Sequence, residues 1–473
     1  MKRTRRLFTL TLSCALLLTL VVSWGASASA PTDGPWVNGS LLPAQMVRYD
    51  SEVSGGKMYV LGFRLPTGET DGSVWVYDPV ADSWGDTGVD MPVPVSNYHI
   101  AKLTDSNGVG LYIFGGRDSA GLCTDTVQVF YPGTNTTATV ATDPWNGQVN
   151  PGERVFPGAV EVVGNKAYAW GGFCGGTTAP FTGSETWIFD PMAAGGARWT
   201  AGPALPVNGA YQTGAVLDGK VYSIGGDTFD GTSLFPYADV LMLDSANLGA
   251  GWQAKASLPL PSSGSPGCDE SRAFGFDSSS GWALAGKVVL AGCGQWNATN
   301  TALPDSFLYD AAGNSWTTFA ALIQARRNHA GAFIVAPDGL SGKMWVGGGY
   351  IPGAVNTGTD TTETYTISFS APTAVGLDDF SARGSDMTLA LVGGGLLLGL
   401  ALAMLKRRPV APRLRSLFTA RRHPAARNRI NKAQPRARAA PCCFQDFCSP
   451  GLTRQKWHGM LPITLPCRHS LRL

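Results

Sequence analysis

The sequence predicts an all-β fold, a β-propeller of six blades that an N-terminal strand closes, and three observations carry this prediction. Of 473 residues, 60 are Gly and 31 are Pro, while only 15% are charged. This composition is typical of many short strands joined by turns and argues against a helical bundle. A strand that ends in glycines recurs along the chain. The last repeat has no tryptophan strand, but a segment of that kind precedes the first repeat.

The recurring strand has six copies, which are MYVLGF (58–63), LYIFGG (111–116), AYAWGG (167–172), VYSIGG (221–226), VVLAGCG (288–294) and MWVGGGY (344–350). The steps between their glycines, counted from Gly62 to Gly347, are 53, 56, 54, 67 and 55 residues. A second apolar strand follows each copy, and most units then have a strand with Trp, such as Trp84. Four short antiparallel strands cannot bury both faces of one sheet alone, so we expect the six units to pack radially.

The two ends of the repeat array predict how the ring of blades closes. The sixth unit stops at Ile367 with no tryptophan strand after it, whereas residues 36–43 (WVNGSLLP) match that strand. We therefore expect the N-terminal strand to complete the last blade.

These motifs resemble the kelch repeat, and the resemblance covers roughly residues 36–368. The first copy departs from the repeat at Phe63, and the fifth has Cys293 within its glycine doublet. The resemblance implies a propeller fold and no particular activity, because one fold hosts many functions.

The two ends of the chain predict where the protein is located. Four basic residues lie within the first six, and an apolar run (7–24) and small residues (26–30) follow, which is the pattern of a secretory signal peptide. Residues 387–405 (MTLALVGGGLLLGLALAML) are uncharged and long enough to cross a bilayer, and the basic cluster 406–408 follows at once. A sorting signal that is later cut is the alternative, but some 65 residues follow, which favours a retained anchor.

We therefore expect a single-pass protein of the cell membrane, with the propeller outside and the C-terminus in the cytoplasm. Its expected segments are a signal peptide (1–30), the propeller (31–370), a linker (371–386), the transmembrane helix (387–405) and a basic, disordered tail (406–473). The predicted propeller is acidic overall, which disfavours nucleic acid as a partner. We expect a monomer without cofactor or metal.

Four cysteines lie in the predicted propeller, and four cysteines allow three pairings. Cys123 and Cys174 follow glycine strands of consecutive units, and Cys268 and Cys293 belong to the region of the fourth to fifth units. We predict these two pairs as disulfides, since an exported compartment permits them. Free buried thiols are the alternative.

Basic and aromatic residues stand where the innermost strands begin, which is the mouth of the predicted channel. The candidate binding residues at this rim are Arg48, His99, Arg154, Tyr211, Arg272, Arg327 and His329. A cationic rim on an acidic body suits a carboxylate, such as a uronic or sialic acid. The alternative is structural, with these arginines pairing with neighbouring loops.

The function that we predict is binding of a glycan or a protein outside the cell, with no catalytic residue assigned. A second hypothesis is an enzyme similar to the sialic-acid mutarotases, with Glu153 or Glu270 as acid or base. A third resembles the copper-radical oxidases, and it would need His99 and His329 on one copper ion. Serine triads and phosphate-binding loops are absent from the sequence.

Overall fold

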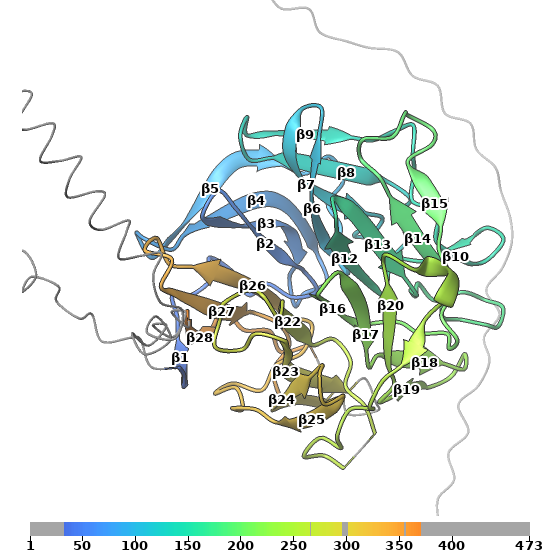
Figure 1. The fold of residues 1–473 in the computed structure, drawn as a ribbon. Helices are drawn as coiled ribbons and strands as arrows, with labels where there is room; N and C mark the ends of the chain where they lie inside the picture. Colours follow the sequence, from blue (N-terminus) through green and yellow to red (C-terminus); the bar gives the residue numbers. More distant parts are fainter. Residues whose placement is uncertain (1–32, 265, 296–300, 354–355, 370–473) are drawn as a thin grey trace, which may run out of the picture. The chain divides into compact units, whose positions relative to one another are not determined.

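A computed structural model describes residues 33–264, 266–295, 301–353 and 356–369 of this chain. The chain divides into two units, residues 1–384 and 385–473, and all the described residues belong to the first. The described residues form six four-stranded antiparallel sheets and two small hairpins. The sheets follow one another round a central axis, from blue to orange in Figure 1. The predicted fold, an all-β propeller of six blades, is confirmed.

Each blade takes its strands in chain order from the axis outward, except that β1 is the outermost strand of the last blade. The blades are, in order, β2 (Ser51–Ser54), β3 (Lys57–Arg64), β4 (Thr70–Asp78) and β5 (Ser83–Asp90); β6 (Ile100–Asp105), β7 (Gly108–Phe114), β8 (Val127–Tyr131) and β9 (Thr136–Thr139); β12 (Ala159–Val163), β13 (Lys166–Trp170), β14 (Thr186–Phe189) and β15 (Trp199–Ala201); β16 (Thr213–Leu217), β17 (Lys220–Ile224), β20 (Val240–Asp244) and β21 (Gln253–Ala254); β22 (Arg272–Phe276), β23 (Lys287–Gln295), β24 (Thr301–Asp310) and β25 (Ser315–Thr318); β26 (Ala330–Val335), β27 (Ser341–Gly347), β28 (Thr362–Ser368) and β1 (Trp36–Asn38).

Two further hairpins stand outside the blades. The first pairs β10 (Gln148–Asn150) with β11 (Glu153–Arg154), and the second pairs β18 (Asp227–Phe229) with β19 (Leu234–Pro236). A short 3-10 helix, η1 (Leu248–Ala250), precedes β21.

The glycines that end the second strands lie where the backbone of another segment approaches closely. At Gly172, φ is +131°, and a Cβ atom would stand 2.2 Å from the carbonyl oxygen of Phe156. No L side chain fits such a position, so the glycine is a requirement of blade packing.

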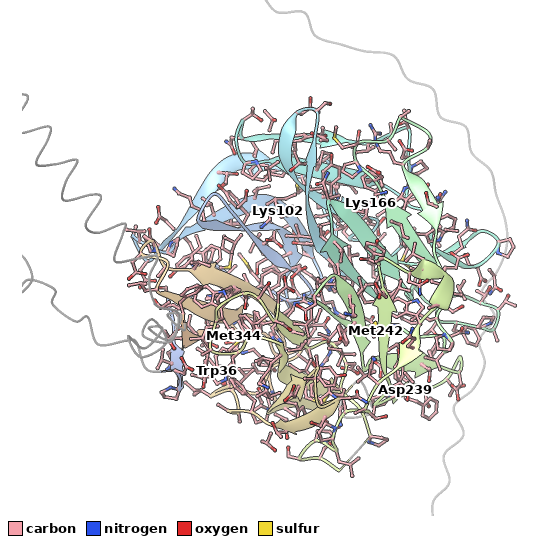
Figure 2. All side chains as sticks on the ribbon, in the orientation of Figure 1. Trp36, Lys102, Lys166, Asp239, Met242 and Met344 are labelled. Carbon is pink, nitrogen blue, oxygen red and sulfur yellow. A yellow bond between two sulfur atoms is a disulfide. The ribbon has the colours of Figure 1, made fainter. Side chains whose placement is uncertain are left out.

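The N-terminal strand closes the ring as predicted. β1 pairs antiparallel with β28, with Trp36 opposite Tyr365 and Asn38 opposite Glu363. The Trp36 side chain is 4% exposed and belongs to the same buried cluster as Met344 of β27, and both are labelled on this blade in Figure 2. Its Nε1 donates a hydrogen bond to the carbonyl oxygen of Ala320 at 2.8 Å, which ties the first strand to the connection between blades 5 and 6.

Large aromatic side chains fill the wedges between blades. Between blades 2 and 3, the ring of Phe189 lies 5.0 Å from that of Phe114 and 4.9 Å from that of Trp199. Tilted and edge-on pairs at these distances add to the free energy gained by burial.

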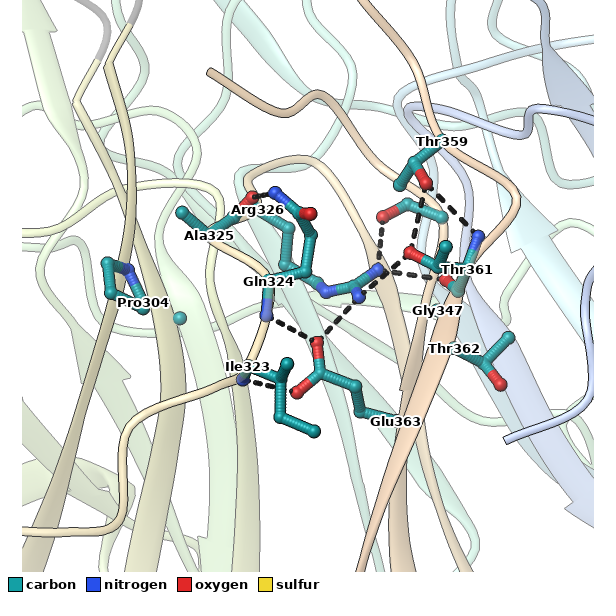
Figure 3. Close-up of polar contacts among 12 residues, drawn as sticks. Pro304, Ile323, Gln324, Ala325, Arg326, Gly347, Thr359, Thr361, Thr362 and Glu363 are labelled. Atoms are coloured by element: carbon teal, nitrogen blue, oxygen red, sulfur yellow. Dashed lines mark hydrogen bonds and ion pairs between the residues drawn. The ribbon is translucent and has the colours of Figure 1, made fainter. Parts of the chain in front are cut away.

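A buried ion pair fixes the connection between blades 5 and 6 (Figure 3). Nη2 of Arg326 lies 2.7 Å from Oε1 of Glu363, and neither side chain is exposed. Glu363 also accepts hydrogen bonds from the backbone N–H groups of Ile323 and Gln324, at 2.6 and 3.0 Å, and Nη1 of Arg326 donates to the carbonyl oxygen of Thr361 at 3.0 Å. With this many bonds on both partners, the charges are compensated without water.

Both predicted disulfides are present. Cys123–Cys174 joins the loops that follow the glycine strands of blades 2 and 3, with 6.0 Å between Cα atoms. Cys268–Cys293 joins the connection before blade 5 to the second strand of that blade, with 4.9 Å between Cα atoms.

The predicted signal peptide, transmembrane helix and basic tail lie outside the described residues. In the part of the chain that the structure describes, no helix is long and apolar enough to span a membrane.

Replacing Trp36 with Ala should lower the free energy of unfolding by about 3–5 kcal/mol, because it empties a buried site in the strand that closes the ring. Val37 of the same strand is 48% exposed, so Val37→Ala is the matched control and should change stability little. Urea unfolding followed by tryptophan fluorescence measures both variants. Equal losses in the two variants would contradict the proposed role of β1.

Candidate functional site

Five residues with left-handed backbone surround the axis, and we call them the inner ring. Each stands two or three residues before the innermost strand of its blade, and they are Arg48 (φ 56°), Asn97 (56°), Tyr211 (52°), Glu270 (49°) and Asn328 (52°). This conformation is uncommon for residues other than glycine and costs about 1–2 kcal/mol for most of them, and less for asparagine.

Backbone hydrogen bonds between blades hold the inner ring. The N–H of Asn97 donates to the carbonyl oxygen of Arg48 at 2.8 Å, and that of Arg48 donates to Asn328 at 3.0 Å. The N–H of Asn328 donates to Glu270 at 3.0 Å, and that of Glu270 donates to Tyr211 at 3.1 Å. Four junctions between blades are thereby bonded around the axis.

Blade 3 interrupts this pattern, because Pro157 takes the corresponding position there. Proline has no N–H to donate and cannot adopt a positive φ. The link from blade 2 into blade 3 therefore cannot be of the same kind.

A cavity of about 670 Å³ lies along the axis beside the inner ring, and we call it the central cavity. The innermost strands of all six blades line it, together with Gly56 of the first turn. Its ionisable lining residues are Asp50, Glu52, His99, Lys102, Glu161 and Arg272. Apolar side chains, such as Phe274 and Ala332, make up other parts of the wall.

Asp50, His99 and Arg272 meet because each stands two residues after a member of the inner ring. Nε of Arg272 lies 3.5 Å from Oδ1 of Asp50, and its Nη2 donates to the carbonyl oxygen of Tyr49 at 2.7 Å. Nδ1 of His99 lies 3.8 Å from Oδ2 of Asp50. Burial, and secondarily the Arg272 charge, lowers the pKa of His99 to about 4 against the opposing effect of Asp50, so the imidazole is neutral at pH 7.

Glu52 and Lys102 form a second charged pair in the wall. Nζ of Lys102 lies 3.1 Å from Oε1 of Glu52 and donates to the carbonyl oxygen of Val53 at 2.8 Å. Burial raises the pKa of Glu52, and Lys102 opposes this shift without cancelling it.

Glu161 differs from the other carboxylates of the central cavity. Its carboxylate lies against Gly214, where a Cβ atom would stand 2.7 Å from Oε1. Burial raises the pKa of Glu161 to about 8, the charges of Asp50 and Glu52 add to the shift, and Arg272 opposes it. At neutral pH this group is therefore mostly a carboxylic acid, able to donate a proton and to regain it.

The inner ring narrows the channel to a cavity of about 30 Å³, which we call the constriction. That volume is on the order of one water molecule. Four of the predicted rim residues line it, namely Arg48, His99, Tyr211 and Arg272. Nη1 and Nε of Arg48 donate hydrogen bonds to the hydroxyl groups of Tyr211 and Tyr350, at 3.5 and 3.3 Å.

The structure does not bring the other three predicted rim residues into either cavity. Arg327 is buried beside the constriction, 2.6 Å from Oε2 of Glu270. Arg154 belongs to the β10–β11 hairpin, where its Nη2 lies 2.6 Å from Oδ2 of Asp125. His329 is fully buried against Gly349 of blade 6, because it stands only one residue after the inner ring and its side chain points to the other side of the strand.

The two carboxylates proposed from the sequence as acid or base have structural partners. Glu270 pairs with Arg327, and Glu153 accepts hydrogen bonds from Asn150 and Thr177. The sequence reasoning missed Glu161. The alternation of side chains along the innermost strands could have identified it. Asp50, Glu52 and Glu161 each stand two or four residues after the inner-ring position of their blade, so they point to the same side of the strand.

Comparison with known proteins agrees with this architecture. Residues 49–264 match the family model described as the KLHDC2/KLHL20/DRC7 Kelch-repeats domain. Among solved structures, the one titled "Structure of YjhT" is similar with a TM-score of 0.50 and 16% sequence identity, covering 70% of this chain and 99% of that chain. At that identity the likeness shows the fold alone. A search of curated proteins finds no match.

Replacing Glu161 with Gln should stabilise the protein progressively, relative to the wild type, as pH rises from 5 to 8. The folded chain keeps a proton on Glu161 that the unfolded chain loses above its ordinary pKa near 4.5, so the wild type loses stability until the pH passes about 8. Urea unfolding at several pH values measures the difference. Glu153→Gln is the control, because its hydrogen bonds lower the pKa of Glu153 and its effect should be constant above pH 5. If the stability difference between Glu161→Gln and the wild type does not change with pH, the pKa of Glu161 is not raised and the prediction is wrong.

Proposed function

We propose that this kelch-repeat β-propeller is an extracellular binding module that takes a glycan in its central cavity, and that residues 387–405 anchor it in the cell membrane. Kelch propellers are modules that commonly bind other proteins, and a protein partner on the loops is the broader form of this hypothesis. The observation that carries the narrower form is the central cavity itself.

The size and chemistry of the central cavity suit a small sugar. Its volume of about 670 Å³ lies within the range of small-molecule sites, roughly 300–1,000 Å³. The Asp50–Arg272 and Glu52–Lys102 pairs supply acceptors and donors side by side, as hydroxyl groups require. Because each carboxylate of these pairs already has a basic partner, the cavity does not favour a free cation, and the Phe274 side chain offers an apolar surface for a sugar ring.

The proposed location outside the cell rests on the ends of the sequence and on the disulfides. A basic and then apolar N-terminus fits export, and 19 uncharged residues before a basic cluster fit an anchor. The Cys123–Cys174 and Cys268–Cys293 disulfides agree with an oxidising compartment.

Filling the central cavity should abolish sugar binding. Ala332 lines it and is 8% exposed, so Ala332→Trp should weaken the best neutral or acidic sugar of a calorimetric panel by at least about tenfold. Ala138 is exposed on β9, so Ala138→Trp adds the same ring elsewhere and should leave the affinity unchanged. If no sugar binds the full-length wild type, or if both variants bind alike, the glycan hypothesis fails and a protein partner on the loops is favoured.

An enzyme of the mutarotase type is a second candidate, and the raised pKa of Glu161 is the observation that favours it. A group that gives and takes a proton near neutral pH suits the opening and closing of a sugar ring. The copper-oxidase hypothesis receives no such support, because His99 lines the central cavity whereas His329 is buried against blade 6.

If the protein is a mutarotase, Glu161→Gln should reduce the rate of anomer exchange at least about a hundredfold while sugar affinity changes little. Exchange NMR on sugars that bind the wild type measures the rate. Binding without any acceleration of exchange by the wild type would leave a binding module alone.

A further inference from the structure

Two arginines stand beyond the inner ring, on the side away from the central cavity, which we call the loop side. Arg64 ends β3, and its backbone exchanges hydrogen bonds with Val47 at 2.9 and 3.1 Å. Arg117 follows the glycine doublet of blade 2, and its backbone exchanges hydrogen bonds with Ser96, both at 2.8 Å. Val47 and Ser96 each directly precede a residue of the inner ring, so the two arginines take the same position in neighbouring blades.

Neither guanidinium forms an ion pair in the described part of the chain. Among the described residues, no carboxylate lies within 4.0 Å of Arg64 or Arg117. The Nε atom of each is buried and has no hydrogen-bond partner in this part of the chain. Nη2 of Arg117 donates to the carbonyl oxygen of Cys174 at 2.9 Å, and the side chain of neighbouring Asp118 accepts the N–H of Leu122.

Positive charge is concentrated around these side chains. Burial lowers the pKa of Arg117, and the charges of Arg48 and Arg64 lower it further, whereas Tyr211 and Asp118 oppose the shift. Arg327 adds little, because Glu270 neutralises it. Like charges that lie near one another lower stability, and a bound anion would relieve the repulsion.

We propose that Arg64 and Arg117 form an anion site on the loop side, which binds the carboxylate of an acidic ligand. A guanidinium presents a planar fork of donors that matches a carboxylate in two parallel hydrogen bonds, and the Nε atoms are the donors left unused. The guanidinium carbon of Arg117 lies 5.9 Å from the ring centroids of Phe156 and of Phe173, so aromatic faces flank this group. This site is separate from the central cavity and does not rest on the proposed function.

Isothermal titration of the full-length protein with glucuronate, succinate, glucose and inorganic phosphate tests the proposal. Glucuronate and succinate should both bind if the carboxylate is what the site recognises, and glucuronate alone if a sugar ring is also needed. Arg64→Gln and Arg117→Gln should each weaken the binding by about tenfold or more, since charged hydrogen bonds contribute roughly 1.5–3 kcal/mol. Lys57→Gln removes the same charge from an exposed pair with Asp78 and should leave the affinity unchanged.

The outcomes separate this site from the proposed glycan cavity. Ala332→Trp should leave the arginine-dependent binding intact, and Arg117→Gln should leave any binding of glucose intact. The proposal is overturned if the wild type binds neither carboxylate, if both arginine variants bind glucuronate as the wild type does, or if phosphate binds more tightly and with the same arginine dependence. The wild-type titrations and the conservative variant Arg117→Lys, which should bind at intermediate affinity, keep the proposal testable if a glutamine variant does not fold.

Discussion

Backbone hydrogen bonds around the axis are the constraint on which the rest of this propeller depends. They join Asn97, Arg48, Asn328, Glu270 and Tyr211 in sequence across five blades. To make them, each residue must turn into the left-handed region just before its innermost strand. That turn sets the phase of the strand that follows, so side chains two residues later point to the axis together and form the wall of the central cavity.

The inner ring also divides two electrostatic environments. In the central cavity, carboxylates outnumber basic groups, and most are compensated, as Asp50 is by Arg272 and Glu52 by Lys102. Glu161 has no such partner among the described residues, and it responds to burial by holding its proton. On the loop side, Arg64 and Arg117 have no ion-pair partner among the described residues, and arginine cannot respond in this way because it does not lose its proton in proteins. A carboxyl group without a basic partner can become neutral, whereas a guanidinium group without an acidic partner keeps its charge and attracts an anion.

How far the sequence could predict this structure depended on periodicity. The six blades and the closing strand with Trp36 followed from spacings that a propeller must repeat, and both disulfides followed from the positions of the four cysteines within those units. The prediction of individual site residues required a strand register accurate to one position. His99 and Arg272 each stand two residues after a member of the inner ring, and both line the central cavity. His329 stands one residue after such a member, and its side chain is buried between blades. Arg154 precedes the Pro157 position by three residues and lies in a hairpin that the repeat does not contain. The proton on Glu161 needed the burial and the neighbouring charges, which no local pattern encodes.

The identity of the strained residues separates fold from function. Asparagine tolerates the left-handed region at little cost, so Asn97 and Asn328 are what stability alone would favour in the inner ring. For arginine, tyrosine and glutamate the same backbone conformation costs more free energy, yet these residues hold the other three positions. The Arg48 side chain contacts Tyr350, Tyr211 lines the constriction, and Glu270 pairs with Arg327. Backbone strain that asparagine would avoid is kept where a particular side chain is required at that position. Arg48, Tyr211 and Glu270 therefore set the shape of the constriction, which lies between the central cavity and the two arginines of the proposed anion site.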